Sequence, residues 1–402
     1  MSLVAAVALA SLAAWAWLVL GQGGFWLGDQ RLDGDDPDPA AWPSVTAVVP
    51  ARDEADVIAR VVASLAAQDY PGPFRVVLVD DESRDGTGDV AHAAAAGSDR
   101  LTIVRTPPRP AGWVGKMWAV QTGVRAAMQM AVAPDYLLLT DADVVHSRGN
   151  VRRLVQRAEA RGLALVSLMV RLHCARGWER LLVPAFVYFF QKLYPFRWVN
   201  DPHARTAAAA GGCMLVHAPT LGRIGGIAQL RGAVIDDCAL GAALKRVGRV
   251  WLGVTTSEHS VRPYVGLGDV WHMVARSAYT QLGYSPVILA GTILGLALVY
   301  LVPPLALLAW PLHGSAVAAT AGAAAWLAMA ATFLPTLALY GRSPLLALAL
   351  PLAGVLYAAM TFDSARRHWT GRGAVWKGRV GAGAGAAGAE VVAPEPPRAA
   401  TG

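Results

Sequence analysis

Hydrophobic positions divide the chain into three regions. Residues Leu3–Leu20 form an uncharged apolar segment whose length suits a helix that spans a bilayer. From about residue 45 to residue 253, short apolar runs alternate with amphipathic stretches, which predicts strands alternating with helices. Three long apolar stretches follow, at Pro286–Trp310, Ser315–Tyr340 and Pro344–Phe362. The pattern predicts an α/β domain held between N-terminal and C-terminal transmembrane helices.

The middle region predicts a mostly parallel, Rossmann-like sheet. Strands are expected at Val45–Pro50, Arg75–Val79, Leu101–Val104 and Tyr136–Thr140, and helices at Glu54–Ala67, Asp85–Ala96 and Val114–Met130. Such alternation gives βαβ units, whose ligands bind beyond the carboxyl ends of the strands. No G-x-G-x-x-G follows the first strand, and Gly112–Met117 lacks the spacing of a phosphate loop. These absences argue against a dinucleotide-binding dehydrogenase and a P-loop ATPase.

Six segments follow from these patterns. They are an N-terminal anchor at residues 1–22, a linker at 23–44, the α/β domain at 45–254, an amphipathic region at 255–285, transmembrane helices at 286–362, and a basic, then disordered tail at 363–402. An uncleaved anchor is favoured over a signal peptide, because the first segment lacks a basic start and a clear cleavage site.

The distribution of arginines bears on membrane topology. The loop Pro311–Gly314 contains no Lys or Arg, whereas Arg342 lies in the next loop. Basic residues favour the cytoplasmic side, so three full C-terminal crossings would put the basic tail on the wrong side. We therefore predict a cytoplasmic tail and one incompletely spanning segment, with the stretch interrupted by Pro303 and Pro304 as the candidate.

Composition supports a membrane protein. The chain of 402 residues is 55% hydrophobic and 16% charged, and its mean hydropathy is +0.40. Its net charge of +7 comes almost wholly from arginine, since only four lysines are present. No basic helix with interleaved aromatic residues appears, so nucleic acid is not an expected partner. The three cysteines show neither paired nor metal-binding spacing.

Candidate chemistry begins at Asp141-Ala142-Asp143, directly after the Tyr136–Thr140 strand. Two carboxylates one residue apart can both face a hard cation that shares its ligands with substrate phosphates. A solvated turn is the alternative, because Asp is common where strands end. Asp80 and Asp81 end another predicted strand, where one carboxylate could accept a hydrogen bond from a nucleobase. Ser83 or Asp85 is expected to cap the following helix.

Three motifs in order resemble glycosyltransferase family 2, which has the GT-A fold. They are Pro50-Ala51-Arg52-Asp53-Glu54, the Asp80–Thr87 stretch and Thr140-Asp141-Ala142-Asp143, and the resemblance covers about half of the chain. It implies that Pro50, Ala51, Arg52, Glu54 and Asp80 or Asp81 bind the nucleotide of a sugar donor, expected to be a UDP-sugar. It also implies that Asp141 and Asp143 hold Mg²⁺ or Mn²⁺ on the donor diphosphate.

Two further groups are assigned around this donor site. Lys116 is expected either to add a positive charge beside the phosphates or to be a solvated lysine near a helix start. Asp236 and Asp237 match the family's later acidic pair, with Asp237 favoured as the catalytic base and Asp236 as a capping or orienting residue. The alternative is that both only cap the helix at Cys238–Val247. Gly211 and Gly212 resemble the small-residue loop that approaches the acceptor.

Two stretches bear on the acceptor. The aromatic stretch Trp178–Trp198 is too short to span, so it either lies in the membrane interface or packs in the core. Residues Asp269–Leu282 predict an amphipathic helix, and Arg276, off its apolar stripe, is assigned to acceptor binding. The sequence Trp271–Pro286 resembles the hopene-associated branch of the family. The Q-x-x-R-W signature of processive polysaccharide synthases is absent.

These observations predict a multi-pass inner-membrane enzyme with a cytoplasmic GT-A domain. It is expected to be a metal-dependent, inverting glycosyltransferase that uses a nucleotide sugar and a lipid acceptor, a hopanoid or another isoprenoid. One alternative is a polyprenyl-phosphate glycosyltransferase, whose phosphate nucleophile needs no base. A second is a membrane scaffold that keeps the fold without turnover.

Overall fold

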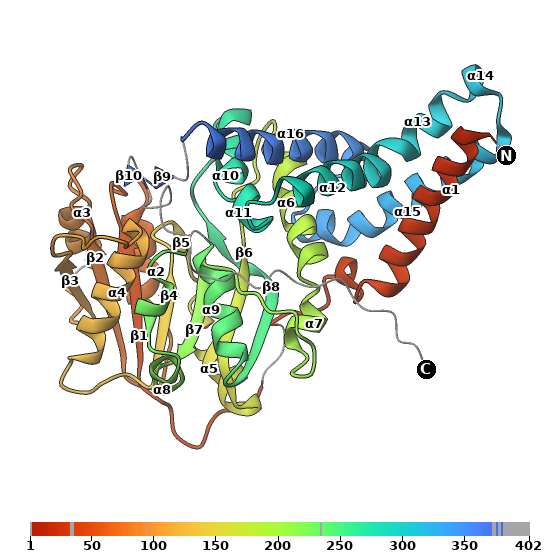
Figure 1. Cartoon of the computed structure of the whole chain (residues 1–402). Helices are drawn as coiled ribbons and strands as arrows, with labels where there is room; N and C mark the ends of the chain where they lie inside the picture. The colour runs from red at the N-terminus through yellow and green to blue at the C-terminus, as the bar shows by residue number, and fades with distance from the viewer. Residues whose placement is uncertain are drawn as a thin grey trace.

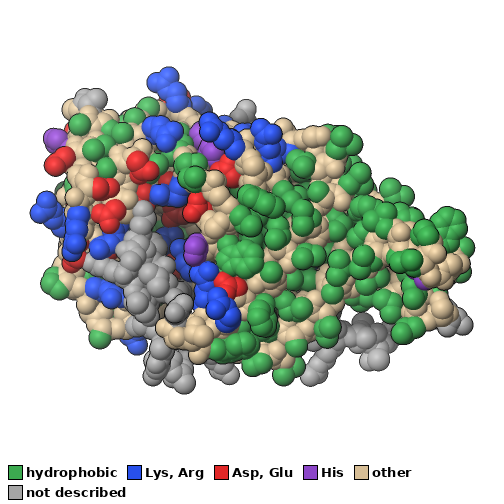
Figure 2. Space-filling view, turned by 90° about the horizontal axis from the view of Figure 1, so that it is seen from above, with side chains coloured by type: hydrophobic (Ala, Val, Ile, Leu, Met, Phe, Trp, Pro, Cys, Tyr) green, Lys and Arg blue, Asp and Glu red, His purple; other side chains and the backbone are tan. Residues whose placement is uncertain are grey.

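An α/β domain and a bundle of apolar helices pack side by side in this protein (Figure 1). The computed structural model describes residues 2–32, 36–95, 97–233, 235–371, 375–376 and 379–380. Most of the predicted disordered tail lies outside these residues. Charged side chains gather over the α/β domain, whereas hydrophobic side chains cover the helical part (Figure 2).

The α/β domain contains an eight-stranded sheet. Its strands are β1 (Val45–Ala51), β2 (Phe74–Asp80), β3 (Leu101–Arg105), β4 (Tyr136–Thr140), β5 (Val144–Val145), β6 (Leu163–Arg171), β7 (Cys213–His217) and β8 (Arg249–Ser260). Their order is β3-β2-β1-β4-β7-β6-β8-β5, in which β7 runs antiparallel to β4 and β6, and β5 runs antiparallel to β8. The predicted GT-A-like, mostly parallel fold is confirmed. The sheet continues through β8 to Ser260, beyond the predicted boundary at residue 254.

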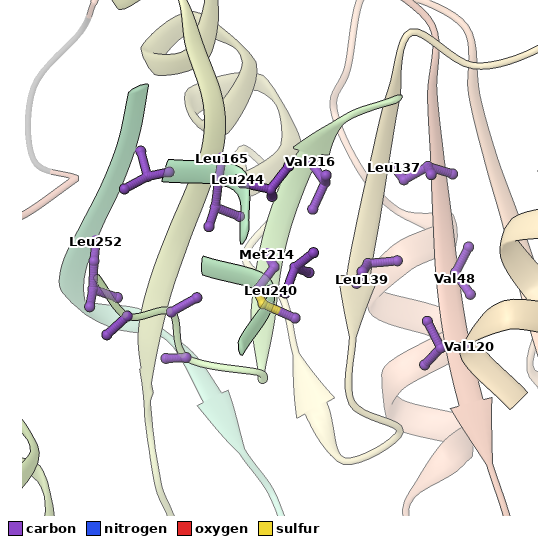
Figure 3. Packing of buried hydrophobic residues seen from close by; sticks show 14 of the residues in the cluster. Val48, Val120, Leu137, Leu139, Leu165, Met214, Val216, Leu240, Leu244 and Leu252 are labelled. Atoms are coloured by element: carbon purple, nitrogen blue, oxygen red, sulfur yellow. The ribbon is translucent and has the colours of Figure 1, made fainter. Parts of the chain in front are cut away.

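Helices cover both faces of this sheet. They include α2 (Ile58–Ala66), α3 (Thr87–Ala94), α4 (Gly115–Met128), α5 (Asn150–Arg161), α8 (Ala218–Arg223) and α9 (Asp236–Lys245). Every residue of β1 and β4 is buried, as expected for strands covered on both sides. Neighbouring residues of β1 pack into cores on opposite faces of the sheet. Val48 packs on the face covered by α4 (Figure 3). Val49 packs into the core of the other face.

Close packing of α4 on the sheet sets the position of its first turn. A Cβ atom on Gly123 would lie 2.4 Å from Cγ1 of Val48 and 2.7 Å from Cγ2 of Val79. The helix can therefore approach β1 and β2 this closely only with glycine at position 123. This contact places the start of α4, including Lys116, beside the carboxyl ends of the strands.

Four helices in the described residues are long and apolar enough to cross a membrane. They are α1 (Leu3–Gly21), a composite helix at Pro286–Leu308, α15 (Ala316–Leu339) and a composite helix at Pro344–Trp369. The Pro286–Leu308 helix consists of α12 (Pro286–Leu296), the π-helical turn η3 (Ala297–Leu301) and α13 (Val302–Leu308), and the short α14 (Trp310–His313) follows. The last helix consists of η4 (Pro344–Ala349) and α16 (Leu350–Trp369), so it extends past the predicted end at Phe362.

The prolines at 303 and 304 do not interrupt the second apolar helix. Pro303 has no N–H to donate to the preceding turn, and the π-helical turn lies directly before it. All three C-terminal segments reach spanning length. The prediction that one of them does not cross completely stays a prediction, as does the cytoplasmic tail.

The aromatic Trp178–Trp198 stretch is mainly buried. It forms α6 (Glu179–Leu193) and α7 (Phe196–Asn200). Tyr188 is fully buried, with its ring centroid 5.3 Å from that of Phe25 and 5.2 Å from that of Phe333. Core packing, the second of the two alternatives, is therefore what the structure shows for the centre of this stretch.

The predicted single helix at Asp269–Leu282 is wrong. The structure has α10 (Leu267–Ala275) and α11 (Ala278–Gln281), separated at Arg276 and Ser277. The N–H of Tyr279 donates to Ser364 Oγ of α16 at 3.0 Å, in place of a bond within a continuous helix. Trp271 Nε1 likewise donates to Asp363 at 2.8 Å. Docking on α16 thus overrides local helix propensity.

Two short strands follow the last apolar helix. They are β9 (Val375–Trp376) and β10 (Arg379–Val380), and they pair antiparallel. The predicted tail arginine Arg372 and Lys377 lie outside the described residues.

Candidate active site

A pocket lies at the carboxyl ends of β1 and β4, where the sequence places its acidic motifs. Polar lining comes from Lys116 of α4, Thr140 and Asp141 after β4, and Asp236 of α9. The remaining lining residues are Pro50, Met117, Val120, Leu139, Gly211, Met214, Ile227, Leu230 and Leu240. Five of the sequence-predicted site residues, Pro50, Lys116, Asp141, Gly211 and Asp236, thus meet in one cavity.

Lys116 joins two carboxylates across this pocket. Its Nζ lies 2.8 Å from Asp141 Oδ1 and 3.6 Å from Asp236 Oδ2. Burial disfavours the charged amine, but the charges of Asp141 and Asp236 outweigh it and raise the pKa of Lys116. The side chain is therefore a cation held in the pocket, and the alternative of a solvated lysine does not describe it.

Asp143, two residues after Asp141, is bound by residues at and just beyond the end of β8. Its Oδ2 accepts from Ser260 Oγ at 2.9 Å and from Arg262 Nε at 3.3 Å. Arg262 also forms an ion pair with Glu54, so it joins the Pro50–Glu54 loop to the acidic motif. The sequence analysis missed Arg262, because it lies 119 residues from Asp143 and belongs to no local motif. Pairing of β5 with β8 brings it there.

The carboxylates of Asp141 and Asp143 suit a divalent cation. Burial and the charge of Asp141 raise the pKa of Asp143, and Arg262 only partly opposes this. The site therefore carries excess negative charge, which a cation would neutralise. Among the described residues, no group of three His, Cys, Asp or Glu side chains is arranged to hold a metal ion. Two carboxylates fit a Mg²⁺ or Mn²⁺ that takes its other ligands from water and phosphate oxygens.

The predicted nucleotide loop is held by hydrogen bonds between β1 and β2. Arg52 Nη1 donates to the Asp81 carbonyl oxygen at 2.5 Å and lies 3.5 Å from its carboxylate, which also accepts from Thr106 Oγ1. Asp80 accepts from the N–H of Ser83 at 2.9 Å. Asp80 and Asp81 are both buried, as is Ala51. Both carboxylates are thus fixed in place beside the loop.

The N-cap of α3 is Gly86, which makes no side-chain hydrogen bond to the helix. Asp85 Oδ1 accepts from the N–H of Thr87, the first residue of α3, at 3.0 Å. The hydroxyl of Ser83 instead accepts from the N–H of Asp53 at 3.1 Å. The prediction that Ser83 or Asp85 is the N-cap is therefore wrong, although Asp85, one position before the N-cap, binds the first N–H of the helix.

Asp237 faces the glycine loop. Its Oδ2 accepts from the N–H of Gly211 at 2.9 Å, and its Oδ1 accepts from the N–H of Cys238 at 2.7 Å. A Cβ on residue 211 would lie 3.3 Å from Oδ2, so glycine permits this close approach. Burial and the charge of Asp236 raise the pKa of Asp237 to about 6, although Lys116 opposes the shift.

A buried histidine forms hydrogen bonds beside the acidic motif, with Thr140 at the end of β4 and with Asn150 at the start of α5. Thr140 Oγ1 donates its single proton to the Gly212 carbonyl oxygen at 2.8 Å. His146 Nε2, 2.9 Å from the same hydroxyl, must then be the donor, and its Nδ1 accepts from Asn150 at 2.8 Å. Burial lowers the pKa of His146 to about 4, consistent with a neutral ring. The sequence analysis did not identify His146, because nothing local marks it.

Several predicted site residues do not line the pocket, and Arg276, at the end of α10, is one of them. It is exposed at the carboxyl end of α10, near the apolar helices. The charge of Arg276 still acts on Tyr264: burial and Asp143 raise the pKa of the Tyr264 hydroxyl to about 12, and the charges of Arg262 and Arg276 oppose this. Arg276 therefore lies outside the pocket, on the helix that packs against α16.

Residues 43–277, more than half of the chain, match the model of a family described as glycosyltransferase like family 2. An N-acetylglucosaminyltransferase of Mesorhizobium japonicum is 33% identical over 129 residues, which are 31% of this chain and 28% of that protein. The succinoglycan biosynthesis protein ExoU of Rhizobium meliloti is 44% identical over 66 residues, 16% of this chain and 19% of that protein. The chain therefore matches less than a third of the length of these two relatives.

A solved structure extends the likeness beyond the family match. It is the mannosyltransferase PcManGT from Pyrobaculum calidifontis, in complex with GDP-Man and Mn²⁺. The TM-score is 0.54 at 22% identity, and the likeness covers 91% of this chain and 99% of that one. At this identity the likeness concerns the fold.

The buried His146 predicts a specific pH dependence of stability. The unfolded histidine takes up a proton near pH 6.5 but the folded one only near pH 4, so folding stability rises with pH between these values. His146→Gln keeps one donor and one acceptor but does not titrate. From pH 7 to pH 5, the wild type should lose about 2 kcal/mol of unfolding free energy relative to this variant. Denaturant titrations of the detergent-solubilised chain measure this; parallel pH profiles would contradict the neutral, buried ring.

Proposed function

This chain belongs to glycosyltransferase family 2, and from that membership we propose a metal-dependent, inverting transfer of a sugar from a nucleotide diphosphate to a membrane lipid. The observation that carries the proposal is one pocket that joins Lys116, Asp141 and Asp236 beside Asp237. A scaffold would not require these charged groups to gather in one partly buried pocket, because removing charges from water costs free energy even when they are paired.

The donor side of the reaction is assigned to the loop and strand ends. Arg52, Glu54, Asp80 and Asp81 would position the nucleotide, for which a uridine diphosphate is proposed. Asp141 and Asp143 would hold Mg²⁺ or Mn²⁺, which when bound supplies positive charge to the leaving diphosphate. The Lys116 amine would bind the same phosphates, and its distance of 2.8 Å from Asp141 supports this assignment.

Asp237 is proposed as the catalytic base. Its carboxylate would take the proton of the acceptor hydroxyl while that oxygen bonds to the anomeric carbon and the bond from this carbon to the diphosphate breaks. Attack on the face opposite the leaving group inverts the anomeric configuration. The Gly211 N–H fixes Asp237, and a pKa of about 6 keeps it a competent base near neutral pH.

The neighbours of Asp237 support a lipid acceptor. Burial, Cys238 and the charge of Asp237 raise the pKa of Tyr194, which directly follows α6. The Tyr194 hydroxyl accepts a hydrogen bond from Gln281 of α11 at 2.5 Å. Both elements are attached to the apolar helices: Tyr357 of α16 donates to the Leu182 carbonyl of α6, and Tyr279 of α11 bonds Ser364. The acceptor side of the site therefore adjoins the helices proposed to lie in the membrane.

An apolar acceptor would gain by staying in these surroundings. Each Å² of apolar surface kept from water is worth about 25 cal/mol, so extracting an isoprenoid body would be costly. A hopanoid is the proposed acceptor, and its support is the resemblance of Trp271–Pro286 to the hopene-associated branch. We propose a multi-pass location in the inner membrane with the α/β domain in the cytoplasm. The sugar is proposed to be of the hexose type, which the names of the bacterial relatives support.

Replacing Asp143 tests metal use. Asp143→Asn should lower kcat/KM at least ~100-fold, because the cation that stabilises the leaving diphosphate is held less well. It should also abolish the Mn²⁺ dependence of donor binding measured by calorimetry. Asp69→Asn, which alters an exposed carboxylate away from the pocket, is the matched control. Full turnover of the wild type in excess EDTA would contradict metal dependence.

Replacing Asp237 tests the base. Asp237→Asn should retain donor affinity but lose ~10²–10⁴-fold in transfer, because the residue acts on the acceptor. Wild-type transfer should fall as the pH drops through about 6, where Asp237 takes up a proton. Near-wild-type transfer by the variant, with no such pH limb, would instead favour a phosphate nucleophile, as in the polyprenyl-phosphate alternative.

A further inference from the structure

Two arginines that pair with no carboxylate among the described residues lie where the α/β domain meets the apolar helices. Arg180 is in the first turn of α6, and Arg342 lies between α15 and η4. Both line a second pocket, apart from the candidate active site. Arg180 Nε donates to the Ala175 carbonyl and Arg342 Nε to the Tyr340 carbonyl, each at 2.9 Å. Within the described part of the chain, their terminal nitrogens make no hydrogen bond or ion pair.

A third arginine, Arg171, and the hydrogen-bonded carboxylate of Glu179 lie near these two arginines. The charges of Arg342, Arg171 and Arg180 all act on Cys174, where they oppose the burial that raises the pKa of the thiol to about 11. The nearby Glu179 carboxylate offsets only one of these three positive charges. This carboxylate is buried and binds the N–H groups of Ala175, Arg176 and Tyr264 and the ring of His173. The pocket therefore keeps a net positive charge.

The other lining residues belong to the ends of two candidate spans. Gly341 follows α15, whereas Leu345 and Leu346 begin the Pro344–Trp369 helix. Leu345 is 75% exposed beside the arginines. The ends of spanning helices lie at the depth of lipid headgroups. The pocket thus offers positive charge and apolar surface together at that depth.

We propose that this pocket binds the phosphate headgroup of an anionic membrane lipid through Arg180 and Arg342, with the lipid chain along Leu345. The forked guanidinium groups match phosphate oxygens in pairs, and basic pockets between membrane helices suit anionic headgroups. The site goes beyond the proposed transfer reaction, since neither arginine lines the active-site pocket.

A bound headgroup would also reach the edge of the α/β domain. The N–H of Leu172 donates to the hydroxyl of Tyr340 at 3.3 Å, and Tyr340 is two residues before Arg342. Arg171, which precedes Leu172, pairs with His259 of β8. Strand β8 in turn pairs with β5, which begins directly after Asp143. The lipid would therefore hold the catalytic domain against the membrane on the side of the acidic site.

Native mass spectrometry of the detergent-solubilised full chain tests this site. Phosphatidylglycerol is the anionic probe, phosphatidylcholine the zwitterionic control and inorganic phosphate the free anion. Wild type should bind one phosphatidylglycerol in preference to phosphatidylcholine. Arg180→Gln/Arg342→Gln should lower that affinity at least ~10-fold, because two charge-assisted contacts are lost. Arg60→Gln/Arg125→Gln, which removes two exposed arginines from α2 and α4, is the matched control.

The outcomes separate the sources of the phosphate. Equal phosphatidylglycerol binding by both double variants would overturn the proposal. Displacement of the lipid by inorganic phosphate at similar concentration would assign the pocket to a free anion and overturn the lipid assignment. Donor binding measured by calorimetry should be unchanged in both double variants, which would show that they are folded. The lipid site is thereby tested separately from the proposed transfer reaction. If the double variant does not fold, Arg180→Gln alone, at an exposed position, is measured in the same way.

Discussion

The candidate active site depends on a balance of charge. Two cations, Lys116 and Arg262, contact four carboxylates: Lys116 lies between Asp141 and Asp236, and Arg262 lies between Asp143 and Glu54. Without these ion pairs, the end of β4, the start of α9 and the Pro50–Glu54 loop would repel one another at short range. The four carboxylates still outnumber the two cations, so the site keeps a negative charge that a divalent cation would offset.

The apolar helices are part of the same packed structure as this site. Buried residues of α1, α6, α10, α15 and α16 form one hydrophobic cluster. Trp15 of α1 donates to the Val299 carbonyl, and Tyr188 of α6 bonds Thr332 of α15. Tyr194, near Asp237, extends α6 toward the active site. The helices proposed to lie in the membrane are thus connected, through α6, to the residues proposed to receive the acceptor.

The sequence predicted the parts of the structure that local pattern determines. Alternating apolar runs predicted β1, β2, β3 and β4, and acidic residues at their ends predicted where Asp80, Asp81 and Asp141 lie. Residues positioned by distant contacts were not predictable. Arg262 reaches Asp143 through pairing of β8 with β5, and His146 acts through Thr140 and Asn150. The break at Ser277 is set by Ser364, far along the chain. Apolar length alone also could not distinguish the membrane interface from core burial for α6.

The central claim is transfer of a sugar to a membrane lipid, and the chemical nature of the product tests it most directly. Membranes from cells expressing the chain would be incubated with a panel of labelled nucleotide sugars and Mn²⁺, and the lipid extract analysed by mass spectrometry. The account predicts that one donor labels a lipid, and that membranes carrying Asp237→Asn yield no labelled lipid. Label confined to a soluble glycan or secreted polysaccharide, with no change in the lipids, would contradict it.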